Sequence, residues 1–211
     1  MPHRNKAITK DVQDKLTPMA VLQDFIEGNS RFIRDEVHTI DHKALITQTT
    51  DGQHPKAIVL SCIDSRVPVE LIFDQTIGDI FVARVAGNFE NTDILGSMEY
   101  SCKVAGSKLI FILGHESCGA IKAACDHVKL GNITSMLSNI QPAVKLSEEE
   151  ITGEYNSSNK EFVNQTIENN VKLTIKRIRE KSPILEEMEK EGEIKIVGGV
   201  YHISTGKVMM L

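Results

Sequence analysis

The 211-residue sequence lacks several features that mark specialised classes of protein. It has no tryptophan, only four cysteines, and no apolar run near the roughly 20 residues that span a bilayer. Four cysteines without regular spacing do not form a disulfide scaffold, so catalytic, metal-binding or buried thiols are expected instead. The polar N-terminal stretch carries no apolar signal core. This predicts a cytoplasmic protein with no membrane partner, or a periplasmic one if a signal peptide has been removed.

The charge balance argues against a nucleic-acid partner. The net charge is -5 and the isoelectric point is near 5.8, and no stripe of lysine and arginine offsets the acidic excess. Apolar residues make up 41% and charged residues 25% of the chain, as in ordinary globular proteins. The length suits one substantial core better than two independent domains.

Short apolar runs alternate with helical patterns from residue 56 onward. Three runs are expected to form strands buried on both faces of a sheet: 56–62, 79–85 and 108–114. Helices are expected between and after them, at 68–74, 92–106 and 118–131. This alternation predicts a single-domain α/β fold, with a mostly parallel central sheet flanked by helices.

The ends of the chain complete this picture. Residues 1–50 are expected to form an N-terminal helical arm, with Thr17 as N-cap and Pro18 at the first helical position. Residues 51–211 are expected to form the α/β domain. Within it we expect a surface loop at 147–160, a long helix from 161 that stops near Pro183, and an edge hairpin of 193–203 with 207–211.

Two of the predicted strands end in possible metal ligands. Cys62 follows the first, and His115 and Cys118 follow the third. Ligands of open parallel sheets bind at the carboxyl ends of the strands, so these side chains are expected at one edge. Thiolate and imidazole favour zinc over magnesium or calcium, and three protein ligands leave a fourth position open, as in catalytic zinc sites. For Cys102 and Cys125, each taken alone, the better reading is a small buried hydrophobe.

The stretches CIDSR and GHESCG together resemble the β-class carbonic anhydrases, whose pattern is Cys-x-Asp-Ser-Arg followed by His-x-x-Cys-Gly. SRVPVELIFD, IFVARVAGN and GSMEY also look like segments of that family, so the resemblance covers residues 15 to 205. It implies a zinc lyase, with one Zn2+ per chain, that reversibly hydrates CO2 to bicarbonate and a proton.

The resemblance also implies roles for single residues at the metal. Cys62, His115 and Cys118 would bind zinc, and Arg66 would hold the carboxylate of Asp64. Asp64 would accept a hydrogen bond from a zinc-bound hydroxide, so that a lone pair of this nucleophile faces CO2. In acid, Asp64 would leave Arg66 and take the fourth zinc position. The competing reading is that Asp64 and Arg66 form only a loop salt bridge that caps the next helix.

Further residues resemble the family's substrate site. Gln53 would donate an amide hydrogen bond to the substrate, and in the family it reaches across a dimer interface. The N–H of Gly119 would be a second donor, as an oxyanion site needs. Phe81, Ala86 and Tyr100 would form an apolar wall for CO2, although the family has a larger aliphatic side chain in place of Ala86.

The family also implies a homodimer or homotetramer, in which the N-terminal arm embraces a partner subunit. The apolar stripe of residues 22–32 fits such an embrace and fits packing on its own sheet equally well. A subset of the family holds an inhibitory bicarbonate with a tryptophan, an arginine and a tyrosine. Here Val59 stands in place of the tryptophan, although Arg84 and Tyr201 look like the other two, so we expect this regulatory site to be absent.

Two other functions compete with CO2 hydration. One is hydrolysis of CS2 or carbonyl sulfide on the same scaffold. The other is a non-catalytic zinc or thiol sensor, with Cys118 and Cys125 as a redox pair. Seven helical residues at about 1.5 Å each separate these two cysteines by roughly 10 Å, too far for an undistorted disulfide. His54, His127 and His202 are proton-transfer candidates by residue type alone, and the sequence favours none of them.

Overall fold

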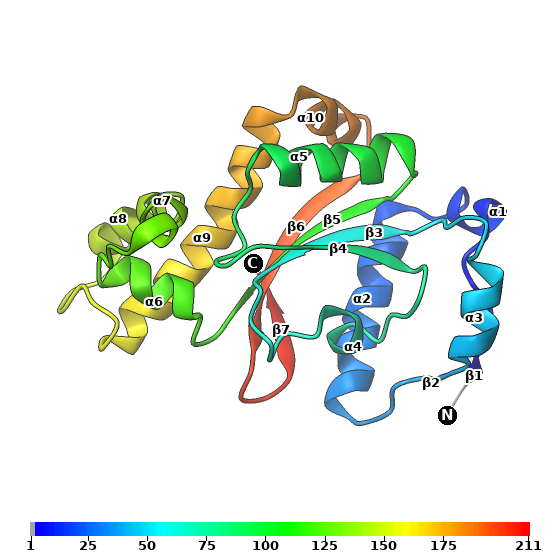
Figure 1. The fold of residues 1–211 in the computed structure, drawn as a ribbon, viewed down its shortest axis with the longest axis horizontal. Helices are drawn as coiled ribbons and strands as arrows, with labels where there is room; N and C mark the ends of the chain where they lie inside the picture. Colours follow the sequence, from blue (N-terminus) through cyan, green and yellow to red (C-terminus); the bar gives the residue numbers. More distant parts are fainter. Residues whose placement is uncertain (1–2) are drawn as a thin grey trace.

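A five-stranded sheet forms the centre of the protein in the computed structural model, which describes residues 3–211 (Figure 1). The first two residues of the predicted arm lie outside the described residues. The strand order is β4-β3-β5-β6-β7, with all neighbours parallel except the antiparallel pair β6 and β7. The strands are β3 (Ala57–Ser61), β4 (Ile80–Arg84), β5 (Leu109–His115), β6 (Lys195–His202) and β7 (Lys207–Met210). The predicted parallel sheet and its C-terminal edge hairpin are confirmed.

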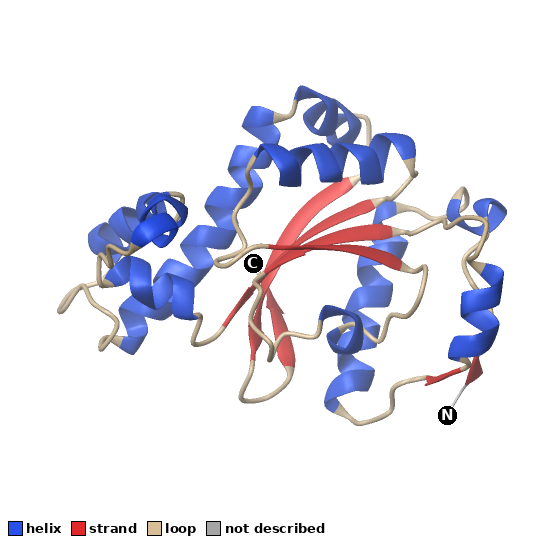
Figure 2. Ribbon diagram, viewed as in Figure 1, coloured by secondary structure: helices blue, strands red, loops and turns tan. Residues whose placement is uncertain are grey.

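Helices cover both faces of this sheet, as Figure 2 shows. The N-terminal region holds α1 (Lys10–Gln13), α2 (Pro18–Ile33) and α3 (His42–Gln48), together with the short parallel pair β1 (His3–Arg4) and β2 (Thr39–Ile40). The sheet is then joined by α4 (Val69–Ile72), α5 (Thr92–Glu99), a π-helical turn (Tyr100–Val104) and α6 (Gly119–Cys125). The remaining helices are α7 (Gly131–Ser138), α8 (Gln141–Glu150), α9 (Lys160–Lys181) and α10 (Pro183–Lys190).

The two faces of β3 and β5 contribute to separate parts of the core, because successive strand residues point to opposite sides. Val59 and Phe111 face α2 and α4, whereas Ile58 and Ile110 face α5, α9 and α10. β3 and β5 are therefore buried on both faces, as their continuous apolar sequences predict. A third apolar cluster lies between α6, α7, α8 and the first half of α9, beyond the carboxyl ends of the strands.

The α2 helix packs on the sheet of its own chain. Thr17 caps it, since its side-chain oxygen accepts the backbone N–H of Ala20 at 3.2 Å. The ring of Phe25 stacks on Phe73 at a centroid distance of 4.6 Å and lies 6.0 Å from Phe111 of β5. The buried part of the apolar stripe thus serves the internal core, while Ile26 remains exposed.

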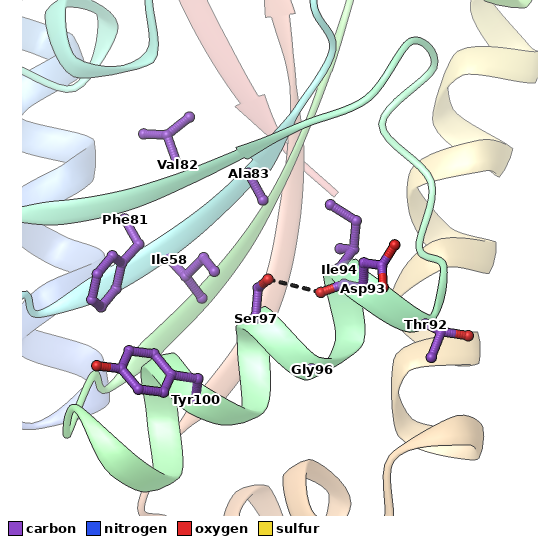
Figure 3. A pocket seen from close by; sticks show the side chains of 10 residues that line it. All are labelled: Ile58, Phe81, Val82, Ala83, Thr92, Asp93, Ile94, Gly96, Ser97 and Tyr100. Atoms are coloured by element: carbon purple, nitrogen blue, oxygen red, sulfur yellow. Dashed lines mark hydrogen bonds between the residues drawn. The ribbon is translucent and has the colours of Figure 1, made fainter.

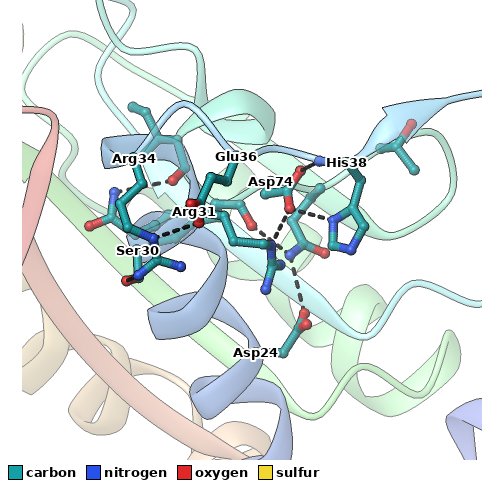
Figure 4. A network of polar contacts seen from close by, with 12 residues as sticks. Asp24, Ser30, Arg31, Arg34, Glu36, His38 and Asp74 are labelled. Atoms are coloured by element: carbon teal, nitrogen blue, oxygen red, sulfur yellow. Dashed lines mark hydrogen bonds and ion pairs between the residues drawn. The ribbon is translucent and has the colours of Figure 1, made fainter. Parts of the chain in front are cut away.

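A buried carboxylate ties the segment after α2 to the segment after α4 (Figure 4). The Oδ2 atom of Asp74 lies 2.5 Å from Arg31 Nε and 2.5 Å from His38 Nδ1, and its Oδ1 accepts the His38 backbone N–H at 3.0 Å. Beside this cluster, Lys56 contacts Asp24 at 2.6 Å. These contacts hold the N-terminal region against the sheet at the end remote from the predicted ligands.

Three predictions about secondary structure were wrong. The helix expected at 118–131 ends at Cys125, because His127 takes a left-handed conformation with φ 51°. The loop expected at 147–160 begins only after Glu150, where α8 ends. The strand at 79–85 is half-buried rather than covered on both faces, because β4 is an edge strand.

Other predicted elements agree with the structure. The long helix α9 ends at Lys181, two residues before Pro183, which opens the unpredicted α10. Among residues 3–211, no helix combines the length and the apolarity that crossing a membrane requires.

The packing of α2 leads to a prediction about stability. Replacing Phe25 with alanine removes a fully buried ring that packs on Phe73 and Phe111. We expect this change to lower the free energy of unfolding by about 3–5 kcal/mol. Gln23→Ala, an exposed change on the same helix, is the matched control and should cost less than about 0.5 kcal/mol. Urea denaturation of the three proteins measures both values. Equal stability of the two variants would contradict the core role of Phe25.

Candidate metal centre

Three buried side chains converge at the carboxyl edge of the sheet. The ligand atoms of Cys62, His115 and Cys118 all lie within 4.8 Å of one another, and the two sulfur atoms are 3.9 Å apart. None of the three residues is more than 4% exposed. Two sulfurs and one imidazole nitrogen at this spacing form a donor set that suits zinc.

Strand register brings these side chains together. Ser61, the last residue of β3, pairs with Leu113 of β5, so the chain leaves β3 at Cys62 beside the end of β5 at His115. Ser117 then adopts a left-handed conformation with φ 53°. This turn brings Cys118, the residue that precedes α6, back toward His115.

The imidazole of His115 is oriented for binding a metal. Its Nδ1 lies 2.8 Å from the backbone oxygen of Glu116, and since a carbonyl only accepts, Nδ1 carries the proton. Nε2 therefore presents its lone pair to the two sulfurs. Nε2 is buried and has no hydrogen-bond partner among the described residues. A histidine that donates from one nitrogen to a carbonyl and keeps the other free is the arrangement found at metal ligands.

Ionisation of one of the two thiols opposes ionisation of the other. A hydrogen bond with Cys118 lowers the pKa of Cys62, and the same contact together with burial raises the pKa of Cys118. The pair thus shares one proton between two sulfurs. A divalent cation at the centre would stabilise both thiolates, because its charge is the largest in the site. The donor atoms and their protonation therefore fit a metal ion.

The predicted dyad lies beside this centre. Arg66 Nη2 donates to Asp64 Oδ2 at 2.7 Å and Arg66 Nε to Oδ1 at 3.0 Å, which is a bidentate pair. Asp64 Oδ2 lies 4.0 Å from Nε2 of His115. The hydrogen bonds from Arg66 lower the pKa of Asp64 to about 2. Asp64 is therefore a fixed carboxylate acceptor at the edge of the metal centre, turned toward Arg66.

Two contacts around the ligands escaped the sequence analysis. The backbone N–H of Gly87 donates to the sulfur of Cys62 at 3.4 Å, which brings the loop after β4, including the predicted wall residue Ala86, to the centre. The carboxylate of Glu116 accepts from His202 Nδ1 at 2.8 Å and from Ser204 Oγ at 3.0 Å, which anchors the ligand turn to the C-terminal hairpin. Neither contact has a local sequence signal, because the first is made by a backbone N–H and the second joins residues far apart in the chain.

Gly119 also lies at the centre, as the first residue of α6 and the direct neighbour of Cys118. N–H groups in the first helical turn have no intrahelical acceptor, so that of Gly119 is available to a ligand. Ala86, Gly119 and the five residues of the ligand set and dyad therefore belong to one region.

The other predicted substrate residues lie elsewhere in the same chain. Gln53 is exposed and precedes β3, whereas Cys62 follows it, so about 16 Å of strand separates them. Phe81 of β4 pairs with Ile58, near the start of β3. The ring of Phe81 lies 6.3 Å from that of Tyr100, which is 56% exposed. Within one chain these three residues do not reach the metal centre.

Phe81 and Tyr100 instead line a cavity of about 770 Å3 between β4 and α5, shown in Figure 3. Ile58, Ala83 and Ile94 contribute apolar surface, and the hydroxyl of Ser97 donates to the backbone oxygen of Asp93 at 2.7 Å. The cavity opens along the edge strand of the sheet.

The positions that resemble the regulatory bicarbonate site are occupied by other contacts. The guanidinium of Arg84 donates to the backbone oxygen of Val67. Tyr201 is 5% exposed and shares an apolar cluster with Val59.

Comparison with known proteins agrees with this geometry. Residues 57–208 match the carbonic anhydrase family model. The chain is 31% identical to carbonic anhydrase 2 of Mycobacterium tuberculosis over 202 residues, which cover 92% of each protein. It is 32% identical to a carbonic anhydrase of Mycolicibacterium smegmatis over 200 residues, or 90% of this chain and 92% of that protein.

Solved structures give the same result. The β-carbonic anhydrase CafA of Aspergillus fumigatus superposes with a TM-score of 0.70 at 27% identity, over 92% of this chain and 89% of that one. One of the two tetrameric β-carbonic anhydrases of Sordaria macrospora superposes with a TM-score of 0.68 at 28% identity, over 77% of this chain and 83% of that one. Sequence, fold and ligand set therefore agree, and the chain belongs to the β-class carbonic anhydrase family.

Proposed function

We propose that the protein catalyses the reversible hydration of CO2 to bicarbonate and a proton at one zinc ion per chain. The observation that carries this proposal is the buried group of Cys62, His115 and Cys118 with the ion pair of Asp64 and Arg66 beside it. A structural zinc needs four protein ligands, whereas this group offers three and sets a carboxylate next to them. The arrangement is that of a catalytic centre.

Cys62, His115 and Cys118 would hold the metal. When bound, zinc acts as a Lewis acid that makes a water-derived nucleophile available near neutral pH. The surrounding protein residues determine where that nucleophile points and what it meets.

Asp64 and Gly119 have complementary roles in this proposal. Asp64 is held as an acceptor by Arg66, so it would orient the O–H of a nucleophile supplied at the metal centre and leave a lone pair facing CO2. The free N–H of Gly119, at the start of α6, would donate to the oxygen that gains charge during the reaction. Ala86 would contribute a small apolar surface beside them.

We infer that the active unit is a dimer in which Gln53, Phe81 and Tyr100 serve the site of the partner subunit. In support, all three lie away from the metal centre of their own chain, and Phe81 and Tyr100 line an open cavity along the unpaired edge of β4. The exposed apolar residues of α2 and the tetrameric state of the Sordaria enzymes are consistent with such assembly. We further propose a cytoplasmic location.

The thiol sensor is less favoured than the enzyme. Cys125 contacts Thr166 at 3.9 Å, and burial raises the pKa of Cys125 to about 11. Such a thiol is a poor nucleophile for disulfide exchange near neutral pH. A CS2 or carbonyl sulfide hydrolase would use the same residues, but relatives that match over most of this chain are named carbonic anhydrases, which favours CO2.

The first test is stopped-flow CO2 hydration by metal-analysed wild type and Cys62→Ser. We expect one zinc ion per wild-type chain, and loss of both zinc and activity in the variant, because a serine hydroxyl is a much poorer zinc ligand than a thiolate. Cys102→Ser, which changes a buried cysteine remote from the centre, is the control and should keep its zinc. Zinc without CO2 hydration, but with turnover of CS2, would favour the alternative substrate class.

The second test concerns pH and Asp64. Because the pKa of Asp64 is lowered in the folded state, its ion pair with Arg66 contributes above the ordinary pKa of 3.8 and is lost only as the pH falls through about 2. Asp64 therefore stays ionised between about pH 6 and 9, and the rate should rise over this range because a bound zinc would make its nucleophile more available at higher pH. Asp64→Asn should lower kcat/KM by about 10–100-fold with zinc retained and the same rising profile. A flat wild-type profile, or a flat variant profile, would contradict this assignment.

The third test concerns the partner's residues. Cys62→Ser and Gln53→Ala should each be nearly inactive alone. In a mixed dimer, the Gln53→Ala subunit supplies an intact metal centre and the Cys62→Ser subunit supplies an intact Gln53 to it. Unfolding and refolding an equal mixture should therefore restore about a quarter of wild-type activity, because half of the dimers are mixed and each has one complete site. If Gln53 acted within its own chain, mixing would restore nothing.

A further inference from the structure

We propose that Asn170 of α9 is a positioning residue for the metal centre, acting on Cys62 through the backbone of Gly87. The inference rests on the proposed zinc site. Asn170 Nδ2 donates to the backbone oxygen of Gly87 at 2.8 Å, and the N–H of Gly87 donates to Cys62 Sγ at 3.4 Å. Two hydrogen bonds thus connect α9, through Gly87 in the loop after β4, to the sulfur of Cys62.

Gly87 needs an external support to hold this direction. Its φ is +87°, a conformation open to glycine but strained for other residues, and the same lack of a side chain leaves its backbone free to rotate. A Cβ atom here would lie 2.5 Å from Cδ1 of Ile140, so a larger residue would have to displace that side chain in addition to adopting the strained φ. The position must therefore be held by contacts, and its carbonyl is held by Asn170.

The contact to sulfur has a direct chemical consequence. A backbone N–H aimed at a thiolate stabilises the charge on sulfur and fixes the direction of its remaining lone pairs. Cys62 is 4% exposed, so water does not readily replace this donor. The orientation of Gly87 therefore sets both the donor strength and the position of one metal ligand.

Asn170 buries one of its two polar atoms without a partner among residues 3–211. The residue is 1% exposed, and its Oδ1 has no hydrogen-bond partner among the described residues. Burying an unsatisfied amide oxygen is unfavourable, and a leucine of similar shape would avoid it. The feature that leucine lacks is the donor toward Gly87.

The adjacent residue provides a contrast. Asn169 is 2% exposed on the same helix, but its Nδ2 donates to Ser147 Oγ at 3.0 Å and to Glu150 Oε2 at 2.7 Å. It joins α9 to α8, and among residues 3–211 it has no hydrogen bond to the loop of Gly87. A change at Asn169 therefore perturbs the same helix to a similar depth without touching the connection to Cys62.

The test compares Asn170→Leu, Asn170→Ala and the matched control Asn169→Leu in the full-length protein. One readout is the zinc dissociation constant, measured by competition with a chelator. The other is the thiolate-to-metal charge-transfer band of the cobalt-substituted protein. We expect both Asn170 variants to bind zinc about 10–100-fold more weakly. Their charge-transfer band should move to lower energy, because a sulfur that loses a hydrogen bond gives up electron density more easily. Asn169→Leu should resemble wild type in both readouts.

Each other outcome overturns the inference. Unchanged affinity and an unchanged band in folded Asn170 variants would show that the donor does not reach the metal centre. The same changes in Asn169→Leu, or loss of the fold in both Asn170 variants, would make Asn170 an ordinary buried structural residue. Neither readout requires CO2 hydration, so an inactive wild type that still shows these differences would contradict the proposed function and leave the inference standing.

Discussion

The parallel pairing of β3 with β5 is the constraint on which the metal centre depends. The pairing runs from Ala57 with Leu109 to Ser61 with Leu113, and it delivers Cys62 and His115 to the same height at one edge of the sheet. Side chains alternate along a strand, so a slip of one residue would turn the apolar side chains of β3 to the wrong faces and displace Cys62. The packing of both faces of the sheet therefore fixes the geometry of the ligands.

Much of the fold could be read from the sequence, because central strands and ligand motifs leave local signals. Continuous apolar runs indicated β3 and β5, and the ligands that follow them indicated the site. The run at 79–85 looks the same, yet β4 lies at the edge, since position within a sheet depends on pairing and not on local composition. The end of α6 before His127 was equally hard to predict, because a histidine in the left-handed conformation has no strong sequence signal.

The surroundings of the ligands were the part of the site that the sequence predicted least well. The carbonyl of Glu116 that orients His115 and the N–H of Gly87 that meets Cys62 are backbone groups, which every residue carries. Their roles follow only from three-dimensional placement. Phe81 and Tyr100 pose a different difficulty, because the family resemblance assigns them to a substrate site without indicating the subunit to which that site belongs.

The distance along the chain between the ligands has a consequence for how the protein acquires its metal. Cys62 and Cys118 are 56 residues apart and meet only after β3 and β5 have paired around the intervening helices. An unfolded chain offers isolated thiols and no preformed site, so metal capture follows folding. A ligand that binds the folded state alone shifts the folding equilibrium by mass action. Binding of the proposed zinc ion would therefore stabilise the folded chain, so zinc depletion would leave more of the protein open to proteolysis as well as inactive.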